Sequence, residues 1–495
     1  MTPVRTRFAP SPTGYLHLGG LRTMLFGWLL ARHTGGVFCY RIEDTDRTRR
    51  VPDAIRSMLD DFEWSHFDVD EGPTAEELHE AGYGWEGAKG YHPSRVSSIQ
   101  SLRLPRYKEV AEQLVASGQA YRCDCSPERL DAERQAQQAR GETAGYDGHC
   151  RTRDVSPDVP HVIRFHIPAG TKVVFNDAIR GEVIWDPVIL KDAVIMKTDG
   201  YPTYHLCSLV DDHDTETTHV LRGEEWLPSA PLHMLIYKAL GWTPPVIAHL
   251  PVIIGKDGRK LSKRHGATFV KNFREDGYLP DALLNYLLLN GWSAGGGDEQ
   301  EVMTREEMIA RFTLEQVHAA PATFSYEKLA WMNGLYMRST PDEQLTTLIM
   351  PFLLQAGLPA EESQVRRMIP YIRERMTNTL KDAIPLVEFL FVETPALGPQ
   401  QAADLKLAPG DARRILETAV AAIRPLESFD PADVERALHN LPETSGASKK
   451  AAFMTVRVAV TGRKVTPPLF ECMSVLGKAR AINRFDRSVE ALTAS

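Results

Sequence analysis

One stretch, residues 7–20, constrains the fold of this chain more than any other; it reads RFAPSPTGYLHLGG. Its first residues favour a strand, two prolines then fix an extended turn, and helix-favouring residues follow from 21 to 31. Where a strand leads through a glycine turn into a helix, free backbone N–H groups and the positive helix end point to one place. Gly19 and Gly20 let a ligand approach the backbone, and His17 adds a donor. The stretch predicts an anion-binding corner, with an ordinary turn before a helix as the alternative.

Bulk properties exclude several classes of protein. The chain has 495 residues, enough for three or so domains, and its 43% hydrophobic and 25% charged content is ordinary for a globular protein. No apolar run reaches the length of a membrane span, and no secretion signal is evident, so we expect no membrane partner. Six cysteines do not form a disulfide scaffold in so long a chain, which predicts a cytoplasmic protein. The net charge of −8 argues against non-specific coating of nucleic acid but not against a local basic face.

Hydrophobic patterning divides the chain into an α/β part with an insertion and an almost entirely helical part. Residues 37–42 predict a strand that ends in EDTD, at the edge where open α/β sheets bind ligands. Residues 162–197 predict a mostly antiparallel insertion between two halves of a parallel sheet. From residue 278 onward the apolar spacing is helical. The same patterning predicts helices at 52–62, 104–117 and 232–240, strand or turn structure at 204–210 and 218–221, a strand at 246–254, and an inserted loop at 72–93.

A basic loop, residues 255–266, reads GKDGRKLSKRHG and is the second informative motif. Five cations and one hydroxyl lie within nine of its residues, and Gly255 and Gly258 make the segment mobile. Such a loop can close on a polyphosphate and neutralise the charge that builds up in a transition state. The alternative is a solvated basic loop.

Taken together, HLGG at 17–20 and KLSKR at 260–264 resemble the two signatures of the class I aminoacyl-tRNA synthetases, which flank ATP on a Rossmann-like sheet. The chain also resembles the bacterial type of glutamyl-tRNA synthetase. RFAPSPTGYLHLGGLRT, RIEDTD, DGYPTYHL, VDDHD, RGEEWL and KLSKRHG occur in the order expected of that family, and WMNG at 331–334 continues the match. The resemblance implies an α/β fold: a Rossmann-like parallel-sheet catalytic domain with an α+β insertion, followed by an all-α anticodon-binding half.

The resemblance implies domains and an activity. The activity is that of a glutamate–tRNA ligase, which activates L-glutamate with ATP to glutamyl-adenylate and transfers it to the 3′ end of tRNA(Glu). We expect a monomer. The implied domains are the first catalytic half (1–120), an insertion that binds the acceptor end (121–200), the second catalytic half (201–255), the KLSKR loop with a helical domain that contacts the tRNA stem (256–335), and helical anticodon-binding domains (336–495).

A glutamate site is implied as well. Guanidinium groups grip carboxylates through two hydrogen bonds, so Arg7 and Arg222 are candidates for the substrate carboxylates, with Arg222 at the side-chain carboxylate. Glu43 is the candidate for the ammonium group. The remaining candidates are the Ala9 backbone and Ser11 for orientation, the Tyr204 phenol, and Ser208, which stands where members of the family differ.

The implied ATP site lies on the corner at residues 17–20. Because a carboxylate is already a nucleophile, the first step needs no protein base, and catalysis is positioning and charge neutralisation by the protein and Mg²⁺. The candidate catalytic residues are His17, Lys260 and Lys263. The candidate ATP-binding residues are Gly19, Gly20, Glu225, Trp226, Ile253, Ser262 and Lys263.

Three cysteines of the insertion have the spacing of a zinc knob found in some members of this family. A closed tetrahedral zinc site needs a fourth ligand. Zinc-bearing members place a histidine two residues after the last cysteine, where this chain has Thr152; Tyr146 and His149 are nearby substitutes. The alternatives are a zinc site whose ligand set is incomplete and a remnant knob without metal. The three residues are Cys123, Cys125 and Cys150.

The helical half raises the question of which tRNA is charged. Arg375 falls where members that accept only tRNA(Glu) carry an arginine, and Arg373 is the alternative if the register shifts. The glutamate anticodon ends in C, whose pairing edge offers two acceptors to a guanidinium. The glutamine anticodon ends in G, whose N–H donors oppose it. The sequence therefore predicts discrimination against tRNA(Gln), with a solvated arginine as the alternative.

Other functions stay open at this point. The close alternative is a non-discriminating enzyme that also charges tRNA(Gln). A truncated paralogue that glutamylates a modified tRNA base lacks an anticodon domain, which the helical half argues against. A non-catalytic tRNA-binding protein that kept the fold is disfavoured by the intact motifs. A nicotinamide oxidoreductase is disfavoured because no G-x-G-x-x-G follows the first strand.

Overall fold

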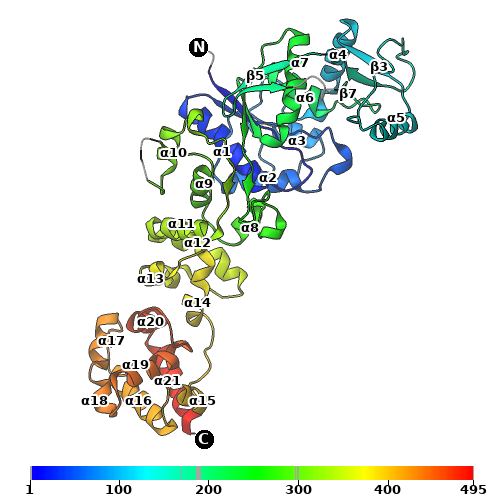
Figure 1. Cartoon of the computed structure of the whole chain (residues 1–495). Coiled ribbons are helices and arrows are strands. Elements are labelled where there is room, and N and C mark those ends of the chain that lie inside the picture. Colours follow the sequence, from blue (N-terminus) through cyan, green and yellow to red (C-terminus); the bar gives the residue numbers. More distant parts are fainter. Residues whose placement is uncertain (1–2, 169, 186–190, 296, 298–299, 494–495) are drawn as a thin grey trace. The chain divides into compact units, whose positions relative to one another are not determined.

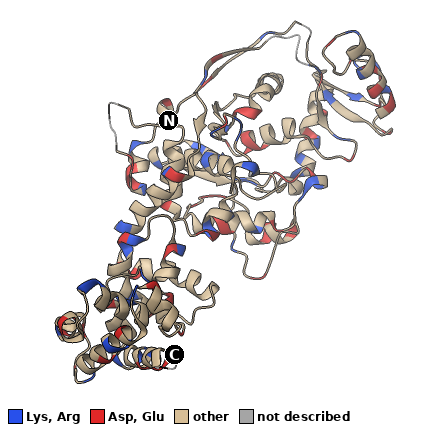
Figure 2. Ribbon diagram, turned by 60° about the horizontal axis from the view of Figure 1, so that its bottom comes forward, with Lys and Arg blue, Asp and Glu red and all other residues tan. Residues whose placement is uncertain are grey.

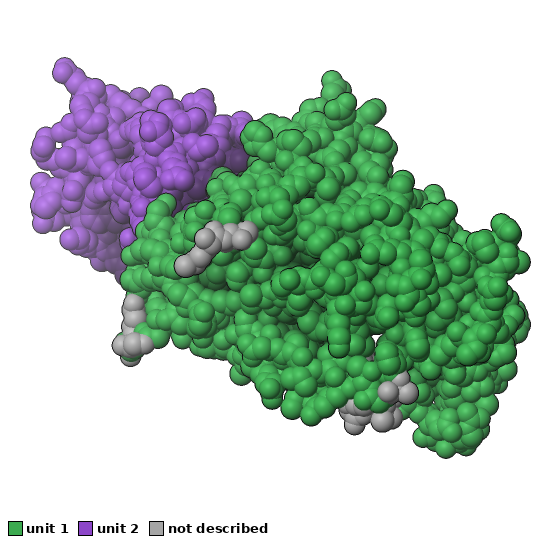
Figure 3. All heavy atoms as spheres, turned by 90° about the horizontal axis from the view of Figure 1, so that it is seen from above, with its two compact units in different colours: residues 1–274, 283–325 green, residues 275–282, 326–495 purple. Residues whose placement is uncertain are grey.

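The computed structural model describes residues 3–168, 170–185, 191–295, 297 and 300–493, with the side chain of Lys263 outside the description. The chain forms two compact units (Figure 3). The first comprises Met1–Arg274 and Leu283–Ser325, and the second Glu275–Ala282 and Tyr326–Ser495. None of the helices in the described ranges combines the length and the apolar run that crossing a membrane requires.

A parallel sheet forms the centre of the first unit (Figure 1). β1 pairs with β2 in parallel, and β8 pairs with β9 in parallel. Thr218, just before β8, donates its N–H to the carbonyl of Arg5 at 3.0 Å, which brings β1 beside β8. The predicted Rossmann-like sheet is confirmed. Its strands are β1 (Arg5–Phe8), β2 (Val37–Tyr40), β8 (His219–Gly223) and β9 (Val246–Leu250).

The predicted antiparallel segment contributes to two different sheets. β3, β4 and β7 form a separate antiparallel sheet. The hairpin of β5 and β6 instead extends the central sheet, because Asp177 at the end of β5 pairs with Ile247 of β9 in parallel. The strands are β3 (Ala120–Cys123), β4 (Val162–Phe165), β5 (Val173–Asp177), β6 (Gly181–Trp185) and β7 (Val194–Met196).

Two predictions of local structure were wrong. Residues predicted as strand or turn at 204–210 belong to the helix α6 (Tyr204–Asp214). Its buried residues fit a strand as well as a helix over seven positions, and their packing against α4 and α7 decides for the helix. The loop predicted at 72–93 contains the helix α3 (Ala75–Glu80), which begins with a capping box from Thr74 and Glu77.

The other helices of the first unit follow the predicted apolar spacing. α1 buries most of its length against the central sheet, and α4 packs on the antiparallel sheet. Their bounds are α1 (Leu18–His33), α2 (Ala54–Trp64), α4 (Leu104–Ala116), α5 (Pro127–Ala139), α7 (Ala230–Leu240), α8 (Val270–Glu275) and α10 (Arg305–Arg311). Two short strands, β10 (Ile253–Ile254) and β11 (Ala322–Thr323), pair in parallel. The helix α9 (Pro280–Leu289) has residues assigned to each unit.

The second unit is helical throughout its described residues, as predicted. Ile415 and Leu416 of α16 and Phe485 of α21 are fully buried in its core. The helices are α11 (Tyr326–Ser339), α12 (Asp342–Gln355), α13 (Glu362–Ile372), α14 (Ala383–Val387), α15 (Pro399–Asp404), α16 (Pro409–Ile423), α17 (Pro431–Leu438), α18 (Leu441–Ser445), α19 (Lys449–Thr461), α20 (Leu469–Leu476) and α21 (Lys478–Thr493).

The WMNG motif in α11 has a structural role in this unit. Asn333 is buried, accepts a hydrogen bond from the N–H of Leu279 at 2.8 Å and donates one to the carbonyl of Asn378 at 2.7 Å. A side chain at Gly334 would place its Cβ 2.7 Å from the carbonyl oxygen of Thr377. The asparagine and glycine therefore hold two loops against the helix, where a larger residue does not fit.

Candidate active site

A cavity of about 950 Å³ opens in the first unit at the carboxyl ends of β1, β2 and β8. This is the sheet edge where open α/β folds bind ligands, and the volume is at the upper end of the usual range for such sites. Ser208 and Ser262 do not line it. The predicted residues that do are Arg7, Ala9, Ser11, His17, Gly19, Gly20, Glu43, Tyr204, Arg222, Glu225, Trp226, Ile253 and Lys260.

His17 caps the N-terminus of α1 at one end of this cavity. Its Nδ1 accepts a hydrogen bond from the N–H of Gly19 at 3.1 Å, so the ring proton of the neutral side chain sits on Nε2. Burial, aided by the charge of Lys260, lowers the pKa of His17 below its ordinary value. The residue is therefore a neutral hydrogen-bond donor at physiological pH.

The corner differs from its prediction in one respect. The N–H of Gly19 is taken by His17, and the N–H of Leu18 is bonded to the carbonyl of Thr268 at 2.9 Å. Two of the backbone donors that the strand–turn–helix pattern predicts as free are thus bonded within the protein. Fewer backbone N–H groups are therefore free at this corner than the pattern predicts.

The basic loop contributes Lys260 to the cavity. Its ammonium lies 3.4 Å from the carboxylate of Glu225, and both groups are exposed. Ser262 is instead bonded to His265, whose Nδ1 lies 3.0 Å from the Ser262 backbone N and 3.2 Å from its hydroxyl. The predicted Lys263 side chain lies outside the described residues. Trp226 packs against Tyr204, with ring centroids 4.3 Å apart.

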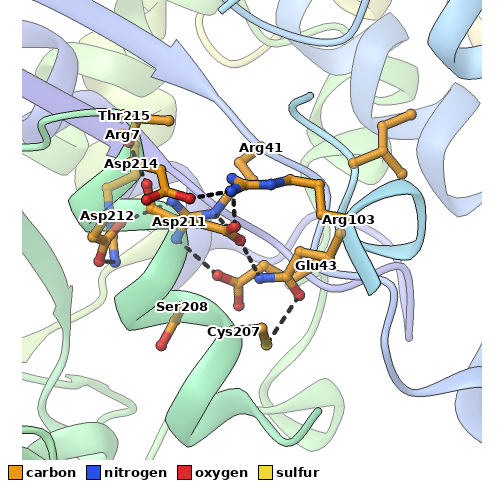
Figure 4. Close-up of polar contacts among 12 residues, drawn as sticks. Arg7, Arg41, Glu43, Arg103, Cys207, Ser208, Asp211, Asp212, Asp214 and Thr215 are labelled. Atoms are coloured by element: carbon orange, nitrogen blue, oxygen red, sulfur yellow. Dashed lines mark hydrogen bonds and ion pairs between the residues drawn. The ribbon is translucent and has the colours of Figure 1, made fainter. Parts of the chain in front are cut away.

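A buried network of charges holds Arg7 and Glu43 (Figure 4). Arg7 donates from Nε to Asp212 at 2.9 Å. Arg41 donates to the same carboxylate at 2.8 Å and to Glu43 at 3.0 Å. Asp211 lies 3.6 Å from Arg41 and completes the network from α6. The sequence analysis did not single out Arg41, Asp211 or Asp212, although they lie within the quoted motifs RIEDTD and VDDHD.

The charges in this network set its protonation states. Burial acts to raise the pKa of Asp212, but Arg7 and Arg41 outweigh it, and the pKa lies below its ordinary value. Burial raises the pKa of Glu43 despite the neighbouring Arg41. Arg7 therefore faces the cavity with its charge already compensated by an ionised aspartate.

Arg222, in contrast to Arg7, has no carboxylate partner among the described residues. It is 7% exposed, and its partners are the Tyr204 hydroxyl at 3.1 Å, His233 Nδ1 at 3.1 Å and His249 Nε2 at 3.0 Å. Its Nη2 is buried and has no hydrogen-bond partner among the described residues. Such an atom is costly unless a ligand completes it. The two histidines were missed by the sequence analysis, since isolated histidines on a strand and a helix carry no spacing signal.

The hydroxyl of Ser208 makes a local hydrogen bond, and the residue does not line the cavity. It is 2% exposed, and its hydroxyl donates to the carbonyl of Tyr204 at 2.7 Å, one turn earlier in α6. It therefore steadies the first turn of the helix that carries Tyr204.

The three cysteines of the insertion converge. Their sulfur atoms all lie within 4.8 Å of one another. The Tyr146 hydroxyl lies 3.4 Å from the sulfur of Cys123 and 3.7 Å from that of Cys125, and it accepts the N–H of Cys150 at 2.8 Å. His149 is exposed, so Tyr146 is the substitute that reaches the cluster. Three sulfurs and one oxygen form a donor set of the number and softness that zinc takes.

The two candidate arginines of the helical unit differ in environment. Arg373 pairs with Asp342 and bonds the carbonyl of Arg338. Arg375, two residues later, is exposed, and no ion pair joins it to a residue that the structure describes. Basic and acidic residues are interspersed along the ribbon (Figure 2). Arg375 is thus the candidate that is available for an external partner.

Comparison with known proteins gives one consistent result. A family model described as the catalytic domain of class I tRNA synthetases (E and Q) matches residues 3–331, and one described as an anticodon-binding domain matches 344–489. The glutamate–tRNA ligase of Dehalococcoides mccartyi is 43% identical over 99% of this chain and 98% of its own. That of Treponema pallidum is 39% identical over 98% and 97%. A crystal structure of a glutamate tRNA ligase from Elizabethkingia meningosepticum, in complex with its amino acid, matches with a TM-score of 0.83 and 33% identity, covering 99% of this chain and all of the other.

Proposed function

This chain belongs to the glutamate–tRNA ligases, a family of class I aminoacyl-tRNA synthetases, and on that premise we propose that its large cavity makes glutamyl-adenylate and passes the glutamyl group to tRNA(Glu). One observation carries the proposal. A buried guanidinium nitrogen of Arg222 that has no hydrogen-bond partner among the described residues belongs to a side chain that shares a cavity with a neutral donor, His17, and a cation, Lys260. The first suits a carboxylate, and the other two suit a phosphate.

In the proposed arrangement, the side-chain carboxylate of glutamate pairs with Arg222, and the α-carboxylate faces the His17 corner. An oxygen of the α-carboxylate attacks the α-phosphorus of ATP, and the bond to pyrophosphate breaks, with its electron pair leaving on pyrophosphate. His17 and Lys260, with Lys263 from the same loop, stabilise the charge that develops on the phosphates. Mg²⁺ bound to ATP would add to the neutralisation that these side chains provide. A terminal ribose hydroxyl of tRNA then attacks the activated carbonyl and AMP leaves.

The charge network favours secondary contacts with the substrate for Arg7 and Glu43. Because Asp212 already compensates Arg7, we assign Arg7 a hydrogen bond to the substrate rather than the main carboxylate contact. Glu43, held by Arg41, faces the ammonium group together with the Ala9 carbonyl and Ser11. Gly19, Gly20, Glu225, Trp226 and Ile253 line the part of the cavity assigned to ATP. The proposed working form is a cytoplasmic monomer.

We further propose that the enzyme discriminates against tRNA(Gln) through Arg375. The exposure of this side chain supports the assignment, whereas Arg373 is tied to Asp342. Replacing Arg375 by Gln removes the cation that favours the two acceptors of the anticodon's final C. We expect the preference for tRNA(Glu) over tRNA(Gln) in kcat/KM to fall about tenfold, in line with roughly 1–3 kcal/mol for a specific base contact.

Charging rates with both tRNAs, measured on the full chain, check this prediction. Arg367→Gln is the matched control, because Arg367 is an exposed arginine of the same unit whose guanidinium donates to the Ser474 hydroxyl at 3.2 Å. Equal charging of both tRNAs by the unaltered enzyme would establish the non-discriminating alternative. An unchanged preference in Arg375→Gln would remove this residue from the account.

We propose in addition that the cysteine cluster binds one zinc ion with Tyr146 as its fourth ligand. Bound zinc would cross-link the strand β3 to the loop that carries Cys150 and so stabilise the insertion. We expect about one zinc per chain in the purified protein by mass spectrometry of its metal content. Cys125→Ser should lose it, and Tyr146→Phe should weaken its retention against a chelator by roughly tenfold or more.

Cys472→Ser provides the control for the zinc prediction, since Cys472 is a buried cysteine of the other unit. It should keep a full complement of metal. Zinc content equal in the Cys125→Ser variant and the unaltered protein, or no zinc in either, would favour the remnant knob.

A further inference from the structure

The hydrogen-bond partners of Arg222 among the described residues are all neutral, and this sets it apart from Arg7 in the same cavity and from Arg41, which both face carboxylates. Arg7 and Arg41 each pair with Asp212. Within the described part of the chain, no carboxylate pairs with Arg222; its three donated hydrogen bonds go to one hydroxyl and two imidazoles. A guanidinium oriented in this way keeps its full positive charge for a ligand.

The tautomer of the first imidazole, that of His249, is fixed by Asp177. His249 on β9 and Asp177 on β5 are both fully buried, and their Nδ1 and Oδ2 atoms lie 2.6 Å apart. With the Nδ1 proton donated to Asp177, Nε2 is left as an acceptor for the Nε–H of Arg222 at 3.0 Å. Asp177 is itself held by the N–H groups of Ile179 and Arg180, each at 3.0 Å. Asp177 thus acts on Arg222 through His249.

The tautomer of the second imidazole, that of His233, is likewise fixed by its hydrogen bonds. His233 on α7 accepts from Arg222 at Nδ1, so its proton sits on Nε2, which lies 3.2 Å from Nδ1 of His205. His205 therefore carries its own proton on Nε2. The two rings fix two edges of the guanidinium, and the remaining nitrogen, Nη2, is buried and unpartnered among the described residues.

We propose that His233 and His249 are positioning residues that select glutamate, because they fix Arg222 through neutral acceptors and leave its charge uncompensated for the substrate carboxylate. The proposal rests on the role assigned to Arg222 above. Aspartate or glutamate acceptors in their place would orient the guanidinium equally well but would repel the substrate carboxylate. Protonation of either histidine would turn an acceptor into a donor facing the guanidinium and would break the arrangement.

The surroundings keep both histidines neutral. Burial, with Arg222, His205, His249 and Arg7 nearby, lowers the pKa of His233 well below its ordinary value. Burial, Arg222 and Arg180 lower the pKa of His249, and Asp177 opposes them without prevailing. Tyr204 also faces this site, and burial raises its pKa, so it stays a neutral phenol. A lowered histidine pKa means that the neutral form persists as pH falls through 6.5 and is lost only below it.

The test uses ATP–pyrophosphate exchange by the full chain in the presence of tRNA(Glu). We expect His249→Leu and His233→Leu to raise KM for glutamate at least tenfold while KM for ATP changes less than twofold. His249→Gln keeps an acceptor at the Nε2 position and His233→Asn keeps one at the Nδ1 position. These two should return KM for glutamate to within about threefold of the unaltered enzyme.

Several results would overturn the proposal. They are a glutamate KM within threefold of normal in both leucine variants, equal defects in the leucine and the amide variants, or parallel losses for glutamate and ATP. If the leucine variants do not fold, the unaltered enzyme still decides. Its glutamate KM at saturating ATP should stay constant from pH 8 to pH 6.5, and a rise centred at 6.5 would contradict the neutral pair. Arg222→Leu distinguishes failure of the histidine proposal from failure of the role assigned to Arg222. A normal glutamate KM in this variant would refute the role of Arg222 itself.

Discussion

Replacing Arg222 by Leu should lower kcat/KM for glutamate in ATP–pyrophosphate exchange about a thousandfold, the largest effect that we expect from any single substitution. The change removes a buried cation that has no carboxylate partner in the described part of the chain and that we pair with the substrate carboxylate. Removing one member of a buried, hydrogen-bonded charge pair costs roughly 3–5 kcal/mol, and each 1.4 kcal/mol is a factor of ten. The loss should fall mainly on KM for glutamate, because the contact is far from the reacting carboxylate.

Arg7→Leu is the comparison for this prediction. Its guanidinium lines the same cavity but is paired with Asp212. We therefore expect a smaller loss of glutamate binding and a larger loss of stability, measured by thermal unfolding, since Asp212 would lose one of its two cations. If Arg7→Leu impaired glutamate binding more than Arg222→Leu, the assignment of the side-chain carboxylate to Arg222 would be wrong.

Replacing His17 by Asn should slow adenylate formation by roughly a hundredfold or more with little change in stability or in KM for glutamate. Asparagine is a good N-cap residue, and its Oδ1 can accept the N–H of Gly19 in place of Nδ1. It cannot reproduce the Nε2–H donor that we assign to the phosphates, and loss of one such donor costs about 10²–10³ in rate. Single-turnover formation of adenylate measures this step directly.

His17→Gln is the complementary variant. Its amide can place a donor near the Nε2 position, but it does not restore the cap, so the expected defect is about 1 kcal/mol in the free energy of unfolding, with a smaller loss of rate. The pair thereby separates the capping role of His17 from its role toward ATP. Equal rate defects in both variants would mean that His17 acts through the corner's structure alone.

The sequence predicted those parts of the fold that depend on periodicity or on a continuous motif. Apolar spacing predicts the strand, turn and helix around residues 4–33 and the helical second unit. Packing in the structure agrees with these local preferences. Residues 204–210 were assigned wrongly because seven residues of mixed burial fit a strand and a helix alike, and only contacts with α4 and α7 decide. The split of the insertion between two sheets depends on one non-local pairing, Asp177 with Ile247, which no local pattern encodes.

The candidate site was likewise predicted only in part: its motif residues could be predicted, and their neighbours could not. Motif residues such as His17, Glu43 and Arg222 were found because each lies in a recognisable stretch, and the structure places them in one cavity. Their charge environment could not be predicted, since Asp212, His233 and His249 come from three other elements. Whether an arginine is compensated or free to bind a carboxylate depends on those neighbours. Spacing in the sequence gives no information about them.

Exchange of pyrophosphate into ATP, driven by glutamate or by glutamine in the presence of tRNA(Glu), tests the central claim most directly. A cavity whose buried guanidinium has an unpartnered nitrogen among the described residues, which we assign to a carboxylate, should favour glutamate over glutamine by about a thousandfold in kcat/KM, because glutamine is neutral at that position. Arg222→Leu should abolish most of that preference. Equal exchange with both amino acids in the unaltered enzyme, or a preference for glutamate that survives Arg222→Leu, would contradict the account.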